Sequence, residues 1–456
     1  MNESSGPVRH LILFVIEALR PDHLSLFGYA RPTTPFLEKF SERATIFSQC
    51  ISPAVRTWQA FTSILTGLYP QRHGVRFIGD KPLASEIPTL GSILHTAGWH
   101  GWADTDDLHN AGLARGFDYF DNQPVGKTAR WRQRLARGSQ RAPTRSFFEH
   151  DQKRTADTLA WIQKHPDTPT FTLLRYFTTH WPYQPPQAFV ELYEACQGRA
   201  HVFNDFNDRR YFLMGQASSP LDYAHAVTHY DAAIRFVDGE LERLVAGLTN
   251  QRVLDQTLLV VTGDHGEGLG DHGIWFDHGD ELYDEAVRVP LLLFGPDIPR
   301  GKAIDSQVQS IDILPTVLEH VGLSVPDKLD GASLSNLMQH GAGGRAYTFA
   351  ESERDYHNVP WRYMSGTEGY LRMARTREWK LIYTPRHLEH KFELYNLTDD
   401  PRERHDCFAT QPETAQTLLQ ALRAWMEGKA PETSSAEENE LDAQVVERLK
   451  ALGYID

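Results

Sequence analysis

Four short apolar runs constrain the fold of this chain more than any other feature of its sequence. They cover residues 11–16, 169–177, 257–262 and 289–294. Runs of this kind predict strands that are buried on both faces of a sheet, as in parallel sheets covered by helices. Helical patterns, such as the one at 224–248, separate them. This alternation predicts an α/β sandwich with a mostly parallel central sheet.

The pattern changes near residue 346. Two segments of alternating character, 370–375 and 379–383, predict a β-hairpin, and 392–397 predicts a further strand. A helix is expected over 414–426. These elements predict a small antiparallel sheet with one helix.

The two patterns divide the 456-residue chain into three expected units. A catalytic α/β domain is expected at 8–345, and a subdomain of antiparallel sheet plus helix at 346–429. Residues 430–456 are expected to form an acidic linker and an amphipathic tail helix. A chain of this length can bury one large core and carry a smaller attached unit.

Charge and hydropathy exclude several classes of function. The formal net charge is −14, so no nucleic-acid partner is expected. No run of about 20 apolar residues predicts a transmembrane segment. Three widely spaced cysteines predict neither a metal cluster nor a disulfide framework. We expect a cytoplasmic enzyme, with a periplasmic or extracellular catalytic domain cut from an anchored parent as the alternative. The sequence leaves the oligomeric state open.

One segment, 127–154, departs from the acidic average because it is rich in arginine. It can be a solvated insertion, or a basic flap that attracts an anionic substrate. Loops usually carry solvated charge, which favours the first interpretation.

Metal-binding residue types follow two of the predicted strands. Glu17 comes directly after the first run, and Asp264 and His265 follow the third. Because the carboxyl ends of parallel strands meet at one edge of a sheet, these side chains are expected to gather there. Thr57 stands where a helix can begin and can join them. Two carboxylates, one imidazole and one hydroxyl suit Zn²⁺ or Mn²⁺.

Each of these residues also has a structural interpretation. Glu17 can be a surface carboxylate, Asp264 and His265 can form a turn, and Thr57 can be a helix N-cap. A carboxylate directly after six apolar residues favours a functional Glu17. N-capping by Thr57 is compatible with catalysis, because the positive end of a helix also stabilises a phosphate.

Several sequence motifs occur along the chain in the order expected for one known superfamily. They are Glu17-Ala18-Leu19-Arg20-Pro21-Asp22, Leu65-Thr66-Gly67 with His73-Gly74, Gly263-Asp264-His265-Gly266-Glu267, and Arg288-Val289-Pro290. With them the chain resembles the sulfatase/alkaline-phosphatase superfamily over nearly its whole length. The resemblance implies an alkaline-phosphatase-like sandwich with a mostly parallel central sheet and a small C-terminal antiparallel subdomain.

The nucleophile position narrows the expected chemistry. Sulfatases usually carry Cys/Ser-x-Pro-x-Arg there, whereas counting back from Leu65-Thr66-Gly67 gives Thr57, Gln59 and Phe61. A threonine cannot be oxidised to the formylglycine aldehyde of sulfatases. Its hydroxyl, held on a metal, can attack phosphorus. Cys50 has the wrong spacing for the motif and is interpreted as a buried structural cysteine.

The set Glu17, Thr57, Asp264 and His265 is similar to the one-metal branch of this superfamily, which includes phosphoethanolamine and phosphoglycerol transferases. The resemblance implies that these four residues hold one Zn²⁺ or Mn²⁺ and that Thr57 is the nucleophile. One metal is favoured over two, because no Asp-x-x-x-His pair follows the nucleophile helix at a convincing strand end.

Four further residues are candidates for contact with the substrate. The resemblance implies catalytic roles for His180 and His278, whose counterparts face the substrate in those relatives. Arg56 and Arg72 lie near Thr57 in the sequence and are candidates for binding the substrate. Solvated loop charge is an equally good interpretation of both arginines.

The sequence therefore predicts a metal-dependent phosphoester hydrolase or phosphoryl/phospho-alcohol transferase that forms a covalent phospho-threonine. Its expected partner is an anionic phosphoester, with a sulfate ester less favoured. Two alternatives remain: a sulfuric-ester hydrolase that works without formylglycine, and a non-catalytic binding protein on a sulfatase scaffold. The complete ligand set favours an enzyme over the last of these.

Overall fold

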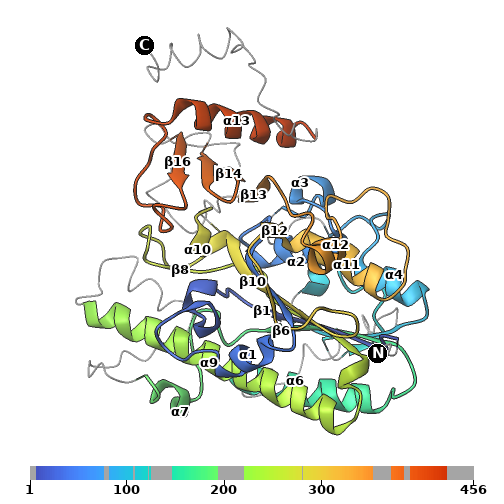
Figure 1. Ribbon diagram of the computed structural model, residues 1–456. Helices are drawn as coiled ribbons and strands as arrows, with labels where there is room; N and C mark the ends of the chain where they lie inside the picture. The colour runs from blue at the N-terminus through green and yellow to red at the C-terminus, as the bar shows by residue number, and fades with distance from the viewer. Residues whose placement is uncertain are drawn as a thin grey trace, which may run out of the picture.

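The computed structural model describes residues 7–76, 82–105, 108–121, 123–124, 146–193, 220–279, 281–352, 371–384 and 391–428. Within these ranges, ten strands form a central sheet and four form a smaller antiparallel sheet. Figure 1 shows the small sheet beneath α13 (Pro412–Met426) at one end of the molecule and the central sheet with its helices at the other. The expected fold class is confirmed. The predicted linker and tail at 430–456, and the basic stretch 127–145, lie outside the described residues.

Parallel strands form the centre of the large sheet. β1 (His10–Ile16) pairs in parallel with β6 (Thr170–Tyr176) on one side and with β7 (Thr257–Gly263) on the other. In this register Ile16 lies beside both Tyr176 and Gly263. All three strands therefore end at one edge of the sheet, and the residues that follow them are neighbours.

The remaining strands extend the sheet on both sides. Beyond β6 lie β3 (His100–Asp104), β4 (Tyr119–Phe120) and β5 (Gln123–Pro124). Beyond β7 lie β10 (Arg288–Phe294), β2 (Thr45–Ile51), β11 (Lys302–Ile304) and β12 (Val308–Gln309). β10 is antiparallel to both β7 and β2. Its apolar run predicts burial correctly but carries no information about direction, because both faces are covered either way.

Helices cover both faces of the central sheet, which explains its unbroken apolar runs. Leu11, Leu13 and Val15 belong to one core, and the alternate side chains of the same strand belong to the other. Burial of each such side chain contributes roughly 1.5–3 kcal/mol. The first core includes α2 (Thr57–Thr66), α4 (Leu90–Thr96), α11 (Ile313–His320) and α12 (Ser335–His340). The second includes α1 (Pro35–Ser41), α6 (Phe147–Gln163) and α9 (Pro220–Asn250).

The small sheet has the strand order β13 (Thr348–Ser352), β14 (Leu371–Arg375), β15 (Trp379–Tyr383) and β16 (Phe392–Asn396). One face packs on α13, where Trp425 stacks on Phe349 with ring centroids 5.1 Å apart. The predicted hairpin, third strand and helix are confirmed. A bridge between Ala54 and Glu351 brings this sheet against the segment that leads into α2.

The described residues also contain three α-helices of one turn: α3 (Pro70–His73), α7 (Gln187–Val190) and α10 (Asp284–Val287). Short 3-10 helices are formed by Pro21–His23, Ser25–Phe27, Leu108–Ala111, Leu254–Gln256 and Ser310–Asp312. A two-stranded ribbon of β8 (Gly268–Leu269) and β9 (Trp275–Asp277) follows β7. In the described part of the chain, no helix is long and apolar enough to cross a membrane.

Candidate active site at the carboxyl edge of the central sheet

Glu17 follows β1 directly, and its side chain is fully buried. Its backbone is fixed on the β6 side, where its N–H donates to Tyr176 O at 2.9 Å and its carbonyl accepts from Thr179 Oγ1 at 2.6 Å. Its carboxylate accepts from Thr57 Oγ1 at 2.7 Å and from Arg175 Nε at 2.5 Å. Glu17 therefore joins the nucleophile candidate to the neighbouring strand.

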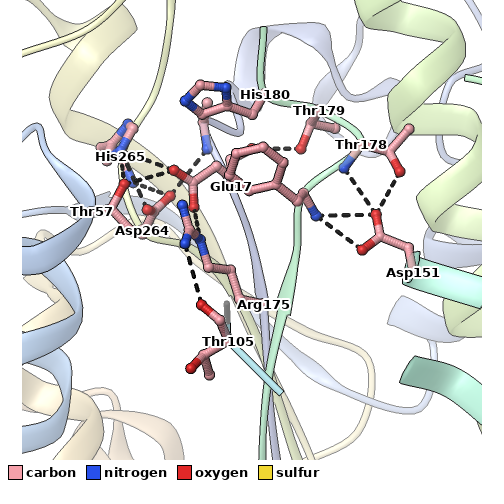
Figure 2. Close-up of polar contacts among 12 residues, drawn as sticks. Glu17, Thr57, Thr105, Asp151, Arg175, Thr178, Thr179, His180, Asp264 and His265 are labelled. Carbon is pink, nitrogen blue, oxygen red and sulfur yellow. Dashed lines mark hydrogen bonds and ion pairs between the residues drawn. The ribbon is translucent and has the colours of Figure 1, made fainter. Parts of the chain in front are cut away.

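Thr57 is the first residue of α2 and lies beside Glu17, as Figure 2 shows. The N-cap of the helix is Arg56, so the N-cap interpretation of Thr57 is wrong. The Thr57 hydroxyl instead donates to Glu17 Oε1 and lies 3.5 Å from His265 Nε2. The unpaired N–H groups in the first turn of a helix favour an anion, so this hydroxyl stands at an electropositive end.

Asp264 and His265 follow β7 and are both fully buried. Asp264 Oδ1 accepts from the N–H groups of Ala18 at 3.0 Å and His265 at 2.9 Å. His265 Nδ1 lies 2.8 Å from Gly266 O, which makes Nδ1 the protonated nitrogen and Nε2 the lone-pair nitrogen. That lone pair faces Thr57 Oγ1 and, at 3.3 Å, Asp264 Oδ2.

The donor atoms of Glu17, Asp264 and His265 fit a divalent cation. They lie within 4.8 Å of one another, with Thr57 Oγ1 beside them. Asp264 Oδ2 is buried and has no hydrogen-bond partner among the described residues, an arrangement that is costly without a counterion. Carboxylate oxygens with one imidazole nitrogen are common ligands of Zn²⁺ and Mn²⁺.

Burial and charge act differently on the two carboxylates. Burial raises the pKa of Asp264 well above its usual range, and the charge of Glu17 raises it further. For Glu17, burial alone would raise the pKa, but the Arg175 guanidinium outweighs it and holds the pKa below its usual range. Burial also lowers the pKa of His265. The site thus holds an ionised Glu17, a neutral His265 and an Asp264 that forms no ion pair with an arginine or lysine among the described residues.

Both predicted catalytic histidines reach the rim of this site. His180 lies one turn beyond β6, and His278 follows β9. Their rings lie 5.2 Å apart, and one nitrogen of each lies within 4.8 Å of a Glu17 oxygen. Nδ1 of His180 is 2.5 Å from Trp181 O, and Nδ1 of His278 is 3.1 Å from Glu267 Oε1. Burial lowers the pKa of His180 to about 4, so its ring is neutral near neutral pH.

The two predicted arginines lie in different places. Arg56 packs against Gly279, the neighbour of His278; a methyl group at Gly279 would come within 2.3 Å of Arg56 Nε. Arg72 follows the opposite end of α2, about 15 Å of helix away from Thr57, where it donates to Asp330 Oδ1 at 2.6 Å and to a backbone carbonyl. The structure brings Arg56 to the site but not Arg72. Substrate binding by either residue remains a prediction.

Arg175 is the main site residue that the sequence prediction missed. It lies within β6, is 5 % exposed, and also donates to Thr105 O at 3.3 Å while its guanidinium carbon lies 4.7 Å from the Phe177 ring centroid. An arginine inside an otherwise apolar buried run is the signal that identifies it, because a buried cation needs a partner. Cys50 is buried, as expected of a structural thiol, and forms no disulfide within the described residues.

The family follows from comparison with known proteins. A family model described as Sulfatase matches residues 9–323, and a second, described as N-sulphoglucosamine sulphohydrolase, C-terminal, matches residues 270–430. The first match covers more than half of the chain, so this chain belongs to the sulfatase family. Enzymes of the sulfatase superfamily are metal-dependent hydrolases, in agreement with the ligand cluster.

Individual relatives are distant. A protein named Sulfatase from Formosa agariphila is 24% identical over 399 residues, covering 77% of this chain and 78% of that one. A Delta 4,5-hexuronate-2-O-sulfatase from Bacteroides thetaiotaomicron is 23% identical over 431 residues, covering 88% and 85%. The solved structure of a phosphonate monoester hydrolase from Silicibacter pomeroyi has a TM-score of 0.72 at 21% identity, covering 95% and 98%. The shared fold therefore includes proteins named for sulfate esters and for phosphonate esters.

Proposed function

We propose that this chain is a metal-dependent hydrolase of anionic esters that uses Thr57 as its nucleophile and prefers phosphoesters. The position of Thr57 Oγ1 supports this proposal most strongly: it lies 2.7 Å from Glu17 Oε1 and 3.5 Å from His265 Nε2, at the N-terminus of α2. A threonine at this position offers a hydroxyl and no route to the sulfatase aldehyde. Attack on phosphorus is the reaction that a hydroxyl in such a site performs.

One divalent ion, Zn²⁺ or Mn²⁺, would be held by Glu17, Thr57, Asp264 and His265. When bound, such an ion supplies positive charge that favours the ionised form of a hydroxyl and of the ester oxygens. The protein adds positive charge of its own, because the N-terminal amides of α2 and the Arg56 side chain lie at the same end of that helix.

The proposed reaction has two displacements at phosphorus. In the first, the Thr57 hydroxyl gives up its proton to water, and Oγ1 bonds to phosphorus while the bond to the leaving alcohol breaks; the leaving oxygen keeps the electron pair and takes a proton from water. In the second, a water oxygen bonds to phosphorus, its proton passes to the neutral ring of His180, and Oγ1 departs with the electron pair and takes a proton from water, which restores the hydroxyl. An acceptor alcohol in place of water gives transfer instead of hydrolysis.

Sulfate-ester hydrolysis is the second candidate, because relatives across most of the chain are named sulfatases. The same steps at sulfur would leave a sulfate ester on Thr57. That adduct lacks the release route that an aldehyde hydrate provides, so a threonine is a poor substitute for formylglycine in this chemistry. For this reason the residues of the site favour phosphorus, whereas the names of the relatives favour sulfur.

Matched aryl esters separate the candidates. Metal-reconstituted protein is assayed on an aryl phosphodiester, phosphonate monoester, phosphomonoester and sulfate, with Thr57→Val as the isosteric variant that lacks the hydroxyl and Thr57→Ser as the variant that keeps it. We expect phosphoester turnover that falls at least about 1,000-fold in Thr57→Val and persists in Thr57→Ser. Turnover of sulfate alone, lost in Thr57→Val, would establish the second candidate. Full activity of Thr57→Val would exclude Thr57 as the nucleophile in either reaction.

A further inference from the structure

A buried carboxylate braces the turn that carries His180. Asp151, on α6, is fully buried and accepts from Phe177 N at 3.1 Å (Oδ1) and 3.0 Å (Oδ2). Its Oδ2 also accepts from Thr178 N at 2.9 Å and from Thr178 Oγ1 at 2.5 Å. These backbone groups follow the last residue of β6, where strand pairing has ended. The Asp151 carboxylate thus accepts the backbone hydrogen bonds that a neighbouring strand would otherwise accept, at the point where the chain enters the site.

The other side of the same turn is tied to Glu17. Figure 2 shows the turn between Asp151 on one side and Glu17 on the other. Thr179 Oγ1 donates to Glu17 O at 2.6 Å, and His180 N donates to Phe177 O at 3.0 Å, which closes the turn. The His180 ring stacks on the Phe177 ring, with centroids 4.5 Å apart and an interplanar angle of 12°. The position of Phe177 therefore determines the position of His180.

We infer that Asp151 is a positioning residue for the reaction: it holds the Phe177–Thr178 backbone so that the His180 ring faces Glu17 and the incoming water. The inference rests on the proposed function, because it assigns Asp151 an effect on turnover through His180. Asp151 does not contact Thr57, Asp264 or His265 in the described structure, so its effect is expected to be confined to the His180 side of the site.

Only a carboxylate satisfies this set of neighbours. The polar groups around the Asp151 carboxylate in the described structure are donors: two backbone N–H groups, the Thr178 hydroxyl and Arg154 Nη1, which lies 2.5 Å from Oδ1. A carboxylate accepts at both oxygens, whereas an asparagine amide has the same shape but places two N–H donors at one of them. Asp151→Asn is therefore a nearly isosteric change that places the N–H donors of the new amide against the donors that surround Asp151.

The test compares variants that disrupt, to different extents, the hydrogen bonds between Asp151 and residues 177–178. Asp151→Asn is expected to lower kcat by roughly 10- to 100-fold, as loss of a residue that orients a site group commonly does, with little change in KM. Thr178→Val removes only the hydroxyl donor and is expected to give a smaller fall in the same direction. Asp157→Asn is the matched control, because Asp157 is a partly exposed carboxylate on the same helix that pairs with Lys153.

A double-mutant comparison shows whether the effect passes through His180. If it does, Asp151→Asn lowers kcat much less in a His180→Ala background than in the wild type. Multiplicative losses in the double variant, or an unchanged kcat in folded Asp151→Asn, would overturn the inference.

Hydrogen exchange measured by mass spectrometry tests the brace without any substrate. Asp151→Asn is expected to exchange faster than wild type in the peptide that contains residues 177–180, with unchanged exchange in the first turn of α2. Unchanged exchange at 177–180 would overturn the brace whatever the activity. A wild type that turns over none of the four esters would contradict the proposed function instead, and the exchange result would then decide the positioning role alone.

Discussion

Two buried charge clusters in this protein differ in how completely their charges are balanced. At the junction with the small sheet, Asp284 accepts from Arg375 Nε at 3.0 Å and Nη2 at 2.9 Å, and lies 2.5 Å from Lys380 Nζ. In the candidate active site, Glu17 and Asp264 are both buried, and within the described residues Arg175 forms an ion pair with Glu17 but not with Asp264. Asp284 thus has two cationic partners, Arg375 and Lys380, and its cluster is balanced. Among the described residues, the cluster of Glu17 and Asp264 has more negative than positive charge and is unbalanced.

The pKa shifts follow this difference. Burial would raise the pKa of Asp284, but Arg375 and Lys380 outweigh burial and hold it below its usual range. Burial raises the pKa of Asp264, and the neighbouring carboxylate adds to the rise. The balanced cluster is suited to holding two parts of the fold together. The unbalanced cluster of Glu17 and Asp264 destabilises the folded protein when no cation is bound and becomes favourable when a cation binds. Functional sites commonly lower the stability of a fold in this way.

Removing a cation from the balanced cluster should have the largest effect on stability. Lys380 is fully buried between Asp284 and Glu403, so Lys380→Met leaves buried carboxylates short of positive charge. We expect the free energy of unfolding to fall by about 3–5 kcal/mol, measured by denaturant titration. Arg377→Met is the control: Arg377 pairs with Asp305 on the surface, and the loss should stay below about 1 kcal/mol. Equal losses in the two variants would contradict the distinction.

A third carboxylate, Asp238, sharpens the comparison because backbone amides are its closest hydrogen-bond donors. Burial raises its pKa to about 7, although the N–H groups of Phe36 and Leu37 lower it in part. The native state therefore binds more protons than the unfolded state between about pH 4 and pH 7, and stability falls as the pH rises through that window. We expect wild type to lose on the order of 1–3 kcal/mol more than Asp238→Asn between pH 5 and pH 8. Parallel pH profiles for the two proteins would refute this.

The smallest predicted effect has the opposite sign. Asp264→Asn replaces a buried carboxyl group whose ionised form is disfavoured by burial and by Glu17, so the metal-free variant should be more stable than metal-free wild type by about 1 kcal/mol. Thermal unfolding in the presence of a chelator measures the difference. A clear loss of stability in the metal-free variant would show that Asp264 serves the fold and not an ion.

The sequence predicted the residues whose position follows from strand ends and missed those placed by tertiary packing. Glu17, Asp264 and His265 were predictable because parallel strands end at a common edge. Asp151 was not, because it lies on a helix 26 residues before Phe177 and meets the turn only when α6 packs beside β6. Proximity to Thr57 in the sequence did not indicate where Arg72 lies, because α2 carries the chain about 15 Å away from Thr57 before Arg72 is reached. The apolar run of β10 likewise gave no indication of the direction in which the strand runs.

Calorimetric titration of metal-free protein with Zn²⁺ or Mn²⁺ tests the central claim most directly, that the unbalanced cluster is a cation site. Asp264→Asn is compared with wild type, and Asp157→Asn serves as the matched surface control. We predict one ion per wild-type chain, the same affinity in Asp157→Asn, and affinity at least about 10-fold weaker in Asp264→Asn. Equal affinity in Asp264→Asn and wild type, or no binding to wild type at all, would contradict the assignment.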